Sequence, residues 1–257
     1  MIATDLDWTL LRSDSTISDY TLSVLRKCRA RGIKIVPATA RSGISELPEL
    51  FDLIDGVVSS NGAAVYDGNK LIFGRDMTMV NMRDLIVAAT DAGVKIIVEG
   101  SVGSFYASFK TEDSWVNQWV HTCETVDFGV LDTSLRYVFA IADTAEETEA
   151  TERVLSELLP HDLCLQGRAD GRLMVFTHKA AIKSKGLAVL AERWEIDRVE
   201  IIAFGDDTID IDLLEYCGIG VAVENALDEV KNAADHICES NDNDGVAKWL
   251  EQHVLTR

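Results

Sequence analysis

Four short apolar segments of this chain each run into polar or acidic residues. The segments span residues 2–6, 33–36, 56–59 and 199–204, and the polar residues at their ends begin with Asp5, Thr39, Ser60 and Gly205. Segments with helical spacing lie between them, and short strands separated by helices predict a doubly wound parallel sheet of the α/β class. Ligands of such sheets bind at the carboxyl ends of the strands, so these four turns form the candidate site.

The predicted helices follow from apolar residues that recur every three or four positions. We expect helices at about 18–32, around Leu47 and Leu50, at 184–194, at 213–217 and at 226–234, with a further strand at 218–223. In the 184–194 segment, the apolar face carries Leu187, Leu190 and Ala191.

The middle of the chain has a different pattern and predicts a separate α+β insert of roughly 100 residues. Helices are expected at 80–92 and 145–159, and strands at 95–98, 104–109, 136–142 and 172–176. The sequence therefore predicts two domains, with a sheet domain that is interrupted by the insert.

Charge and cysteine content exclude several classes of function. The 257 residues carry a net charge of −19, which opposes binding to nucleic acid and to anionic membranes. The five cysteines are far apart, as in a cytoplasmic protein with reduced thiols. The start of the chain has no basic segment of a signal peptide, and no apolar run is long enough to span a bilayer.

Carboxylates dominate two of the four turns. Asp5 and Asp7 follow the first strand, and Asp206 and Asp210 follow the strand at 199–204. If these edges meet, the acids crowd together and need either a cation or raised pKa values. An all-oxygen site of this kind suits Mg²⁺. The alternative is that each acid is merely a cap or turn residue.

These residues resemble the motifs of the haloacid dehalogenase-like (HAD) superfamily. Residues 5–9, Asp-Leu-Asp-Trp-Thr, resemble its first motif, and residues 39–41, Thr-Ala-Arg, resemble its second. Lys185 resembles the third motif, and residues 205–210 resemble the fourth, GDxxxD. Residues 61–63 and 243–247 further resemble the Cof-type subgroup. The resemblance implies a Rossmann-like core at 1–76 and 179–257, and a C2B-type cap at 77–178 that covers the catalytic edge.

The resemblance also implies a mechanism of phosphate-ester cleavage. Asp5 is the expected nucleophile, which forms an aspartyl-phosphate, and Asp7 is the expected general acid and base. Thr39 and Lys185 are expected to hold the phosphoryl group. The Mg²⁺ site implied by the family consists of Asp5, the Asp7 backbone carbonyl and Asp206, with Asp210 organising the waters of the ion.

Three further residues are expected to bind substrate, namely Ala40, Arg41 and Asn61. Two of them have an alternative role. Arg41 could pair with an acid of the core instead of the substrate, and Asn61 could supply only the turn before Gly62. Trp8 and Ile209 depart from the family pattern, in which Gly and Asn are usual. If the backbone at Trp8 has a positive φ, the residue is strained. If instead the indole is directed toward the cap, it narrows the entrance to the catalytic site.

The sequence thus favours a Mg²⁺-dependent phosphatase that acts on small phosphorylated metabolites, such as sugar phosphates or phosphorylated cofactors like FMN or pyridoxal phosphate. Two alternatives stay open. One is a phosphomutase of the same architecture, and the other is a phospho-ligand binder with impaired catalysis.

Overall fold

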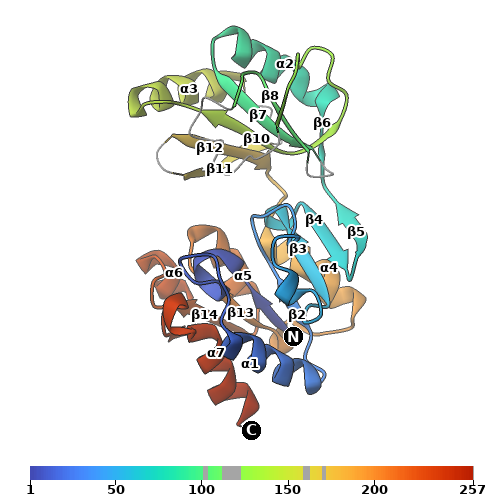
Figure 1. Cartoon of the computed structure of the whole chain (residues 1–257), viewed down its shortest axis with the longest axis vertical. Coiled ribbons are helices and arrows are strands. Elements are labelled where there is room, and N and C mark those ends of the chain that lie inside the picture. Colours follow the sequence, from blue (N-terminus) through green and yellow to red (C-terminus); the bar gives the residue numbers. More distant parts are fainter. Residues whose placement is uncertain (101–103, 112–122, 159–162, 170–171, 257) are drawn as a thin grey trace. The chain divides into compact units, whose positions relative to one another are not determined.

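The chain divides into two compact units in the computed structural model. Unit 1 comprises Met1–Gly74 and Ala181–Arg257, and unit 2 comprises Arg75–Ala180. These borders lie two residues from those expected at 76 and 178. The structure describes all residues except 101–103, 112–122, 159–162, 170–171 and 257 (Figure 1).

Unit 1 is built on a five-stranded sheet in which every pairing is parallel. Its strand order is β15-β14-β13-β1-β2. The bounds are Ile2–Thr4 for β1, Ile35–Pro37 for β2, Ile202–Gly205 for β13, Ile219–Val223 for β14 and His236–Cys238 for β15. The chain moves from β1 to β2 in one direction and from β13 to β15 in the other, so the predicted doubly wound fold is confirmed.

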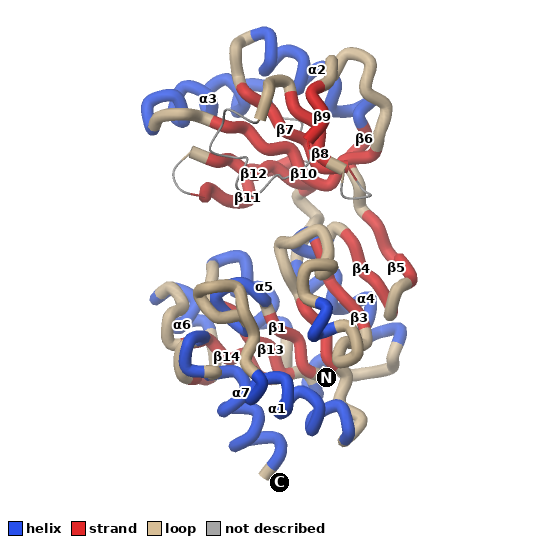
Figure 2. The backbone as a smooth tube through the Cα atoms, viewed as in Figure 1, coloured by secondary structure: helices blue, strands red, loops and turns tan. Residues whose placement is uncertain are grey.

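Helices pack around this sheet in two groups (Figure 2). Helix α1 contacts α7, whereas α4 contacts α5 and α5 contacts α6. Right-handed crossovers in opposite directions place such groups on opposite faces of the sheet. The bounds are Asp19–Ala30 for α1, Lys183–Arg193 for α4, Ile211–Tyr216 for α5, Asp228–Ala233 for α6 and Gly245–Leu250 for α7.

A three-stranded antiparallel sheet extends unit 1 beyond β2. It consists of β3 (Gly56–Ser59), β4 (Ala64–Asp67) and β5 (Lys70–Gly74). A parallel bridge between Ala38 and Val58 joins it to the end of β2. The sequence predicted β3 but neither β4 nor β5. The helix expected around Leu47 and Leu50 is a single 3₁₀ turn, Pro48–Leu50, and Pro48, which lacks an amide hydrogen, occupies its first position.

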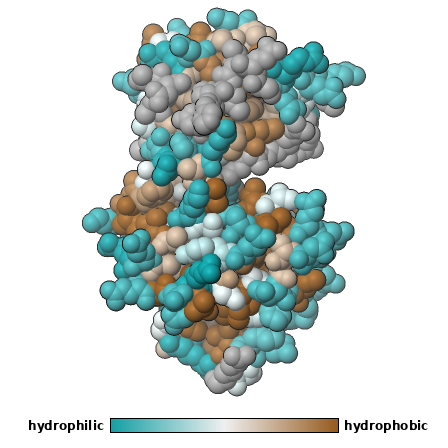
Figure 3. Space-filling view, turned by 180° about the vertical axis from the view of Figure 1, so that it is seen from behind, coloured by the Kyte–Doolittle hydropathy of each residue, from teal (hydrophilic) through white to brown (hydrophobic). Residues whose placement is uncertain are grey.

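Strand β1 is buried along its whole length, as is usual for a central strand of a parallel sheet. Ile2 lies between Ile35 of β2 and Ile202 of β13. The visible surface of unit 1 mixes hydrophilic and hydrophobic residues (Figure 3). Among the described residues, no helix combines the length and the hydropathy needed to cross a bilayer.

Unit 2 is a largely antiparallel sheet of strand order β11-β12-β10-β7-β8-β9, with β6 paired to β10. Its strands are β6 (Met77–Thr78), β7 (Lys95–Gly100), β8 (Phe105–Ala107), β9 (Cys123–Thr125), β10 (Ser134–Ile141), β11 (Leu163–Ala169) and β12 (Leu173–His178). Helices α2 (Met79–Asp91) and α3 (Ala145–Leu158) pack on this sheet. The sequence did not predict β6, β9 or β11.

Alternation along β7 divides the core of unit 2 between the two faces of its sheet. Ile96 and Val98 belong to the cluster that includes residues of α2 and α3, whereas Ile97 belongs to a second cluster with Tyr137 and Phe139. Each unit therefore has a hydrophobic core of its own.

Gly62 permits a close approach of two segments in unit 1. Its φ is +97°, and a Cβ at this position would lie 2.2 Å from the carbonyl oxygen of Ile182, just before α4. Gly32 has a similar φ of +79°, but a Cβ there would meet no atom within 4 Å. The two glycines thus share a backbone conformation and differ in the space around them.

We expect Gly62→Ala to destabilise the protein by more than Gly32→Ala. In the Gly32 variant, the only cost is that of an alanine in the left-handed conformation, about 1–2 kcal/mol. The Gly62 variant has the same cost and, in addition, the clash of the new Cβ with Ile182. Urea unfolding of both variants measures the difference, and equal losses would contradict the steric role of Gly62.

Candidate active site

The first site segment is the turn that follows β1. A single π-helical turn, Leu6–Leu10, is closed by the hydrogen bond from the Leu11 amide to the Leu6 carbonyl. Asp5 and Asp7 have extended backbones, and Trp8 then adopts a left-handed conformation with φ 62° and ψ 2°. This reversal brings Thr9 back toward β13, where its hydroxyl donates to Asp206 over 2.6 Å.

Trp8 is a conformational outlier because a bulky side chain rarely tolerates positive φ. The strain costs about 1–3 kcal/mol at a non-glycine residue. The Asn225 carboxamide donates to the Trp8 carbonyl over 2.7 Å and helps to hold this conformation. The positive φ considered from the sequence is therefore present, and the indole is 55% exposed.

The second site segment is the turn that follows β13. The Asp210 carboxylate folds back over this turn and accepts hydrogen bonds from the amides of Asp206 and Asp207. Gly205 makes this possible, because a Cβ there would lie 2.4 Å from the Cβ of Asp210. The glycine of GDxxxD thus has a steric explanation in this chain.

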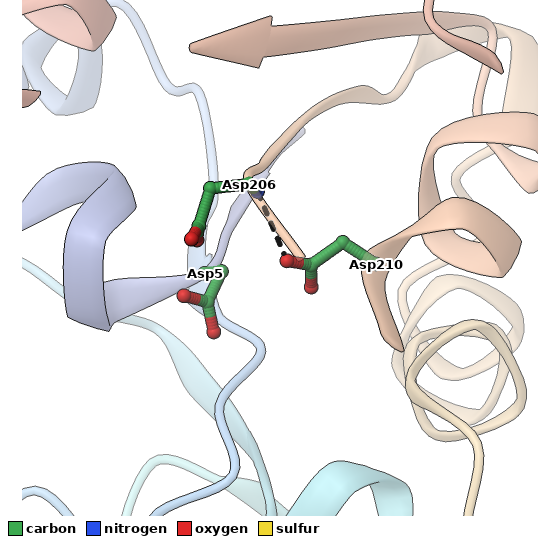
Figure 4. A group of neighbouring side chains, drawn as sticks. All are labelled: Asp5, Asp206 and Asp210. Carbon is green, nitrogen blue, oxygen red and sulfur yellow. Dashed lines mark hydrogen bonds between the residues drawn. The ribbon is translucent and has the colours of Figure 1, made fainter. Parts of the chain in front are cut away.

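These two turns bring three carboxylates together. One carboxylate oxygen from each of Asp5, Asp206 and Asp210 lies within 4.8 Å of the others. Figure 4 shows the three groups pointing toward one another from the ends of β1 and β13 and from the start of α5. Asp5 and Asp210 are buried, and Asp206 is partly buried.

A lysine neutralises part of this cluster. The Lys183 ammonium lies 2.6 Å from Asp5 Oδ1 and 2.6 Å from Asp210 Oδ1, and its side chain is 1% exposed. Burial by itself lowers the pKa of Lys183, but attraction to Asp210 and Asp5 outweighs that effect and raises this pKa. The ammonium is therefore charged at neutral pH.

The motif resemblance implied Lys185 at this position, but the structure brings Lys183 there instead. Lys185 is exposed, because two residues along a helix turn the side chain by about 200°. A signal for Lys183 was present: it lies four residues before Leu187 and seven before Leu190, on the apolar face of α4. The carboxylate of Asp212 accepts from the Ser184 amide at the start of this helix and helps to fix its position.

The remaining carboxylates are costly to ionise without another cation. Burial raises the pKa of Asp5, and the Lys183 ammonium opposes this rise. Burial also raises the pKa of Asp206 to about 6, and Asp210 adds repulsion while the Thr9 hydroxyl opposes the rise. A divalent cation would relieve both penalties, so this all-oxygen donor set fits Mg²⁺. Both oxygens of Asp210 already accept hydrogen bonds, which favours Asp5 and Asp206 as the direct ligands.

Asp7 does not join this cluster through its carboxylate. Arg41 holds it with two hydrogen bonds, Nε to Oδ2 at 2.8 Å and Nη2 to Oδ1 at 2.6 Å. Glu46 lies 3.5 Å from the same guanidinium. Of the two roles considered for Arg41, this structure has the pairing with an acid of the core.

The turn after β2 brings the other predicted residues to the same edge. The Ala38 amide donates to the Thr4 carbonyl, so Thr39 and Asp5 both follow directly after this pairing. Thr39 is fully buried, and its hydroxyl accepts from the Arg41 amide, whereas Ala40 is exposed. The Asn61 amide donates to the Thr39 carbonyl, and Asn61 has a φ of 52° immediately before Gly62.

Besides Lys183, Thr9 and Asn225 contribute to this geometry without having been predicted. Thr9 lies within the first motif, and its position two residues after Asp7 was the available signal. No sequence pattern indicated Asn225, whose carboxamide joins Trp8 to the Asn241 amide across distant segments.

Residues 2–250 match a family model described as haloacid dehalogenase-like hydrolase. The chain belongs to this family. A HAD-like hydrolase from Bacteroides thetaiotaomicron has the same fold, with a TM-score of 0.88, 26% identity and 98% coverage of both chains. A sugar phosphatase of HAD subclass IIB has a TM-score of 0.79 and 25% identity, covering 98% of this chain and 97% of its own.

A Bacillus subtilis 5-amino-6-(5-phospho-D-ribitylamino)uracil phosphatase is 27% identical over 98% of this chain and 97% of its own length. The resemblance stated from the motifs is thus confirmed. The predicted enzyme class, a HAD phosphatase, is confirmed as well.

The buried lysine of this HAD phosphatase gives a direct test. Lys183→Met leaves Asp5 and Asp210 without a counter-ion, and we expect a loss of about 3–5 kcal/mol in the free energy of unfolding. Lys185→Met is the matched control and should change it by less than about 0.5 kcal/mol. Urea unfolding in the presence of EDTA measures both, and a larger loss at Lys185 would contradict the assignment.

Mg²⁺ should stabilise the folded HAD phosphatase, since an ion bound at this site would neutralise Asp5 and Asp206. At about a hundredfold the dissociation constant, we expect the unfolding temperature near pH 7.5 to rise by about 5 °C. Asp206→Asn should raise the unfolding temperature measured without Mg²⁺. It should also raise the Mg²⁺ concentration needed for the stabilisation by at least about tenfold. KCl of equal ionic strength is the control, and the same rise with KCl would exclude a specific site.

Proposed function

We propose that this protein is a Mg²⁺-dependent phosphatase that hydrolyses small phosphorylated metabolites through an aspartyl-phosphate at Asp5. The observation that carries the proposal is the Lys183 ammonium held between Asp5 and Asp210, with Asp206 beside them. This arrangement supplies a nucleophile, a fixed cation and an oxygen site for a metal at one edge of the sheet.

In the first step, an Asp5 carboxylate oxygen attacks phosphorus and the bond to the leaving oxygen breaks. Asp5 must be ionised to attack, and Lys183 favours that state, since its positive charge opposes the effect of burial on the pKa of Asp5. The Thr39 hydroxyl lies after the neighbouring strand and is proposed to donate to a phosphoryl oxygen. When bound, Mg²⁺ would neutralise negative charge on the phosphoryl oxygens.

Asp7 is the proposed general acid and base. It would give a proton to the leaving oxygen and later take one from the water that cleaves the aspartyl-phosphate. Arg41 keeps the Asp7 carboxylate in one orientation through two hydrogen bonds. We therefore assign Arg41 to positioning Asp7.

The substrate class follows from charge and from the relatives. The net charge of −19 disfavours polyanions and membrane surfaces, which supports a small phosphorylated substrate. Relatives named as a sugar phosphatase and as a phosphatase of a ribitylamino-uracil phosphate support the same class. We assign unit 2 the role of a C2B-type cap that selects the substrate. No disulfide joins any of the five cysteines, which all lie in described segments, and this supports a reducing cytoplasmic location.

Asp5→Asn tests the nucleophile. We expect Mg²⁺-dependent turnover of 4-nitrophenyl phosphate to fall below detection, whereas the exposed Asp14→Asn control should keep the wild-type rate. Turnover that survives in the Asp5 variant would contradict the mechanism. Conversion of hexose 1-phosphate to the 6-phosphate by wild-type protein primed with a hexose bisphosphate would favour a phosphomutase instead.

Asp7→Asn tests the general acid and base. 4-Nitrophenolate leaves without a proton, so this variant should release one equivalent per enzyme in a burst and then stall, because Asp7 no longer activates water. With an alkyl phosphate, the variant should show no burst, and its rate of turnover should fall by about 10²–10⁴-fold. Glu46→Gln alters the other acid that faces Arg41 and should behave like wild type. Equal losses for both esters without a burst would exclude this role for Asp7.

A further inference from the structure

Trp8 is the feature of the site that hydrolysis of a phosphate ester does not require. Its backbone is left-handed, and glycine adopts that conformation without strain. Trp8 is 55% exposed, so more than half of its surface makes no contact that could offset the strain. A strained and exposed aromatic side chain indicates a function outside the packing of its own unit.

The position of Trp8 relates this exposed ring to the reacting atoms. Trp8 directly follows Asp7, the proposed donor of a proton to the leaving group. The Trp8 carbonyl is fixed by Asn225, whose own carbonyl oxygen accepts from the Asn241 amide. The backbone that carries the indole is thus held by hydrogen bonds.

A second exposed apolar residue is joined through its backbone to Asp206. Leu227 is 52% exposed, and its amide donates to the carbonyl of Asp206 over 3.0 Å. It lies two residues after Asn225, the residue that fixes Trp8. Two exposed apolar residues thus adjoin residues of the site, Trp8 through the chain to Asp7 and Leu227 through its backbone to Asp206. Exposed apolar groups favour an organic leaving group over a strongly hydrated one.

We propose that Trp8 is a specificity-determining residue whose indole stacks on a planar ring in the leaving group. The substrate class is phosphate monoesters of alcohols that carry an aromatic or heteroaromatic ring near the ester oxygen. A flat π-surface favours such rings over puckered or open-chain groups of equal size. The inference rests on the proposed function and adds the chemistry of the leaving group.

The test compares benzyl phosphate with cyclohexylmethyl phosphate, since both release a primary alcohol and differ in the planarity of the ring. Wild type should prefer the benzyl ester in kcat/KM. Trp8→Gly, which removes both ring and strain, should reduce this preference about three- to tenfold. Trp8→Phe should retain most of the preference, and Trp8→Leu should lose it.

Phe51→Ala is the matched control, because Phe51 is similarly exposed at 51% and lies outside the site segments. It should leave the preference unchanged. If Trp8 acted only in folding or in contacts with unit 2, Trp8→Gly would lower kcat/KM for both esters by the same factor. The ratio of the two kcat/KM values would then stay unchanged, and that result would overturn the inference.

A binding measurement separates recognition from the rate of hydrolysis. Benzylphosphonate should inhibit wild type more strongly than cyclohexylmethylphosphonate, and Trp8→Gly should abolish that difference. Equal inhibition of wild type by the two compounds would overturn the inference. Wild type that hydrolyses neither ester, nor 4-nitrophenyl phosphate, would overturn the proposed function and this inference with it.

Discussion

The buried ammonium of Lys183 is the interaction on which the architecture of unit 1 depends. A charge without access to water is tolerated only when opposite charges and hydrogen bonds surround it. Asp5 and Asp210 meet that requirement, and they come from two turns that are more than 200 residues apart in the chain. Gly205 lets Asp210 fold back over its own turn, and Gly62 lets the turn after β3 approach Ile182, just before α4. Asp5, the proposed nucleophile, is therefore also one of the two acids that make this charge tolerable.

The gathering of the candidate site residues could be predicted from the sequence because parallel strands end at one edge of their sheet. Asp5, Thr39 and Asp206 follow buried strands, and the structure places all three at that edge. The lysine was assigned from motif spacing alone, which selected Lys185. The helical period selects Lys183, because the side chain must share a face with Leu187. Physical periodicity was the better guide at this position.

Other features could not be predicted because they depend on partners far away in sequence. The salt bridge between Arg41 and Asp7 requires that the turns after β1 and β2 be adjacent. The short strands β4, β6 and β9 have no strong alternation of their own and exist through their neighbours in a sheet. The left-handed conformation of Trp8 depends on a tight π-helical turn that no local propensity of tryptophan would suggest.

The order of the strands has a consequence for how this chain is made. β1 pairs with β2 within the first 40 residues, but its other neighbour, β13, begins at Ile202. During synthesis, one edge of β1 stays open until the ribosome has produced all of unit 2 and α4. Open edges can pair with other chains, and Asp5 then also lacks Lys183. A nascent chain of this protein therefore passes through a long interval in which unit 2 can fold around its own core and unit 1 cannot be completed.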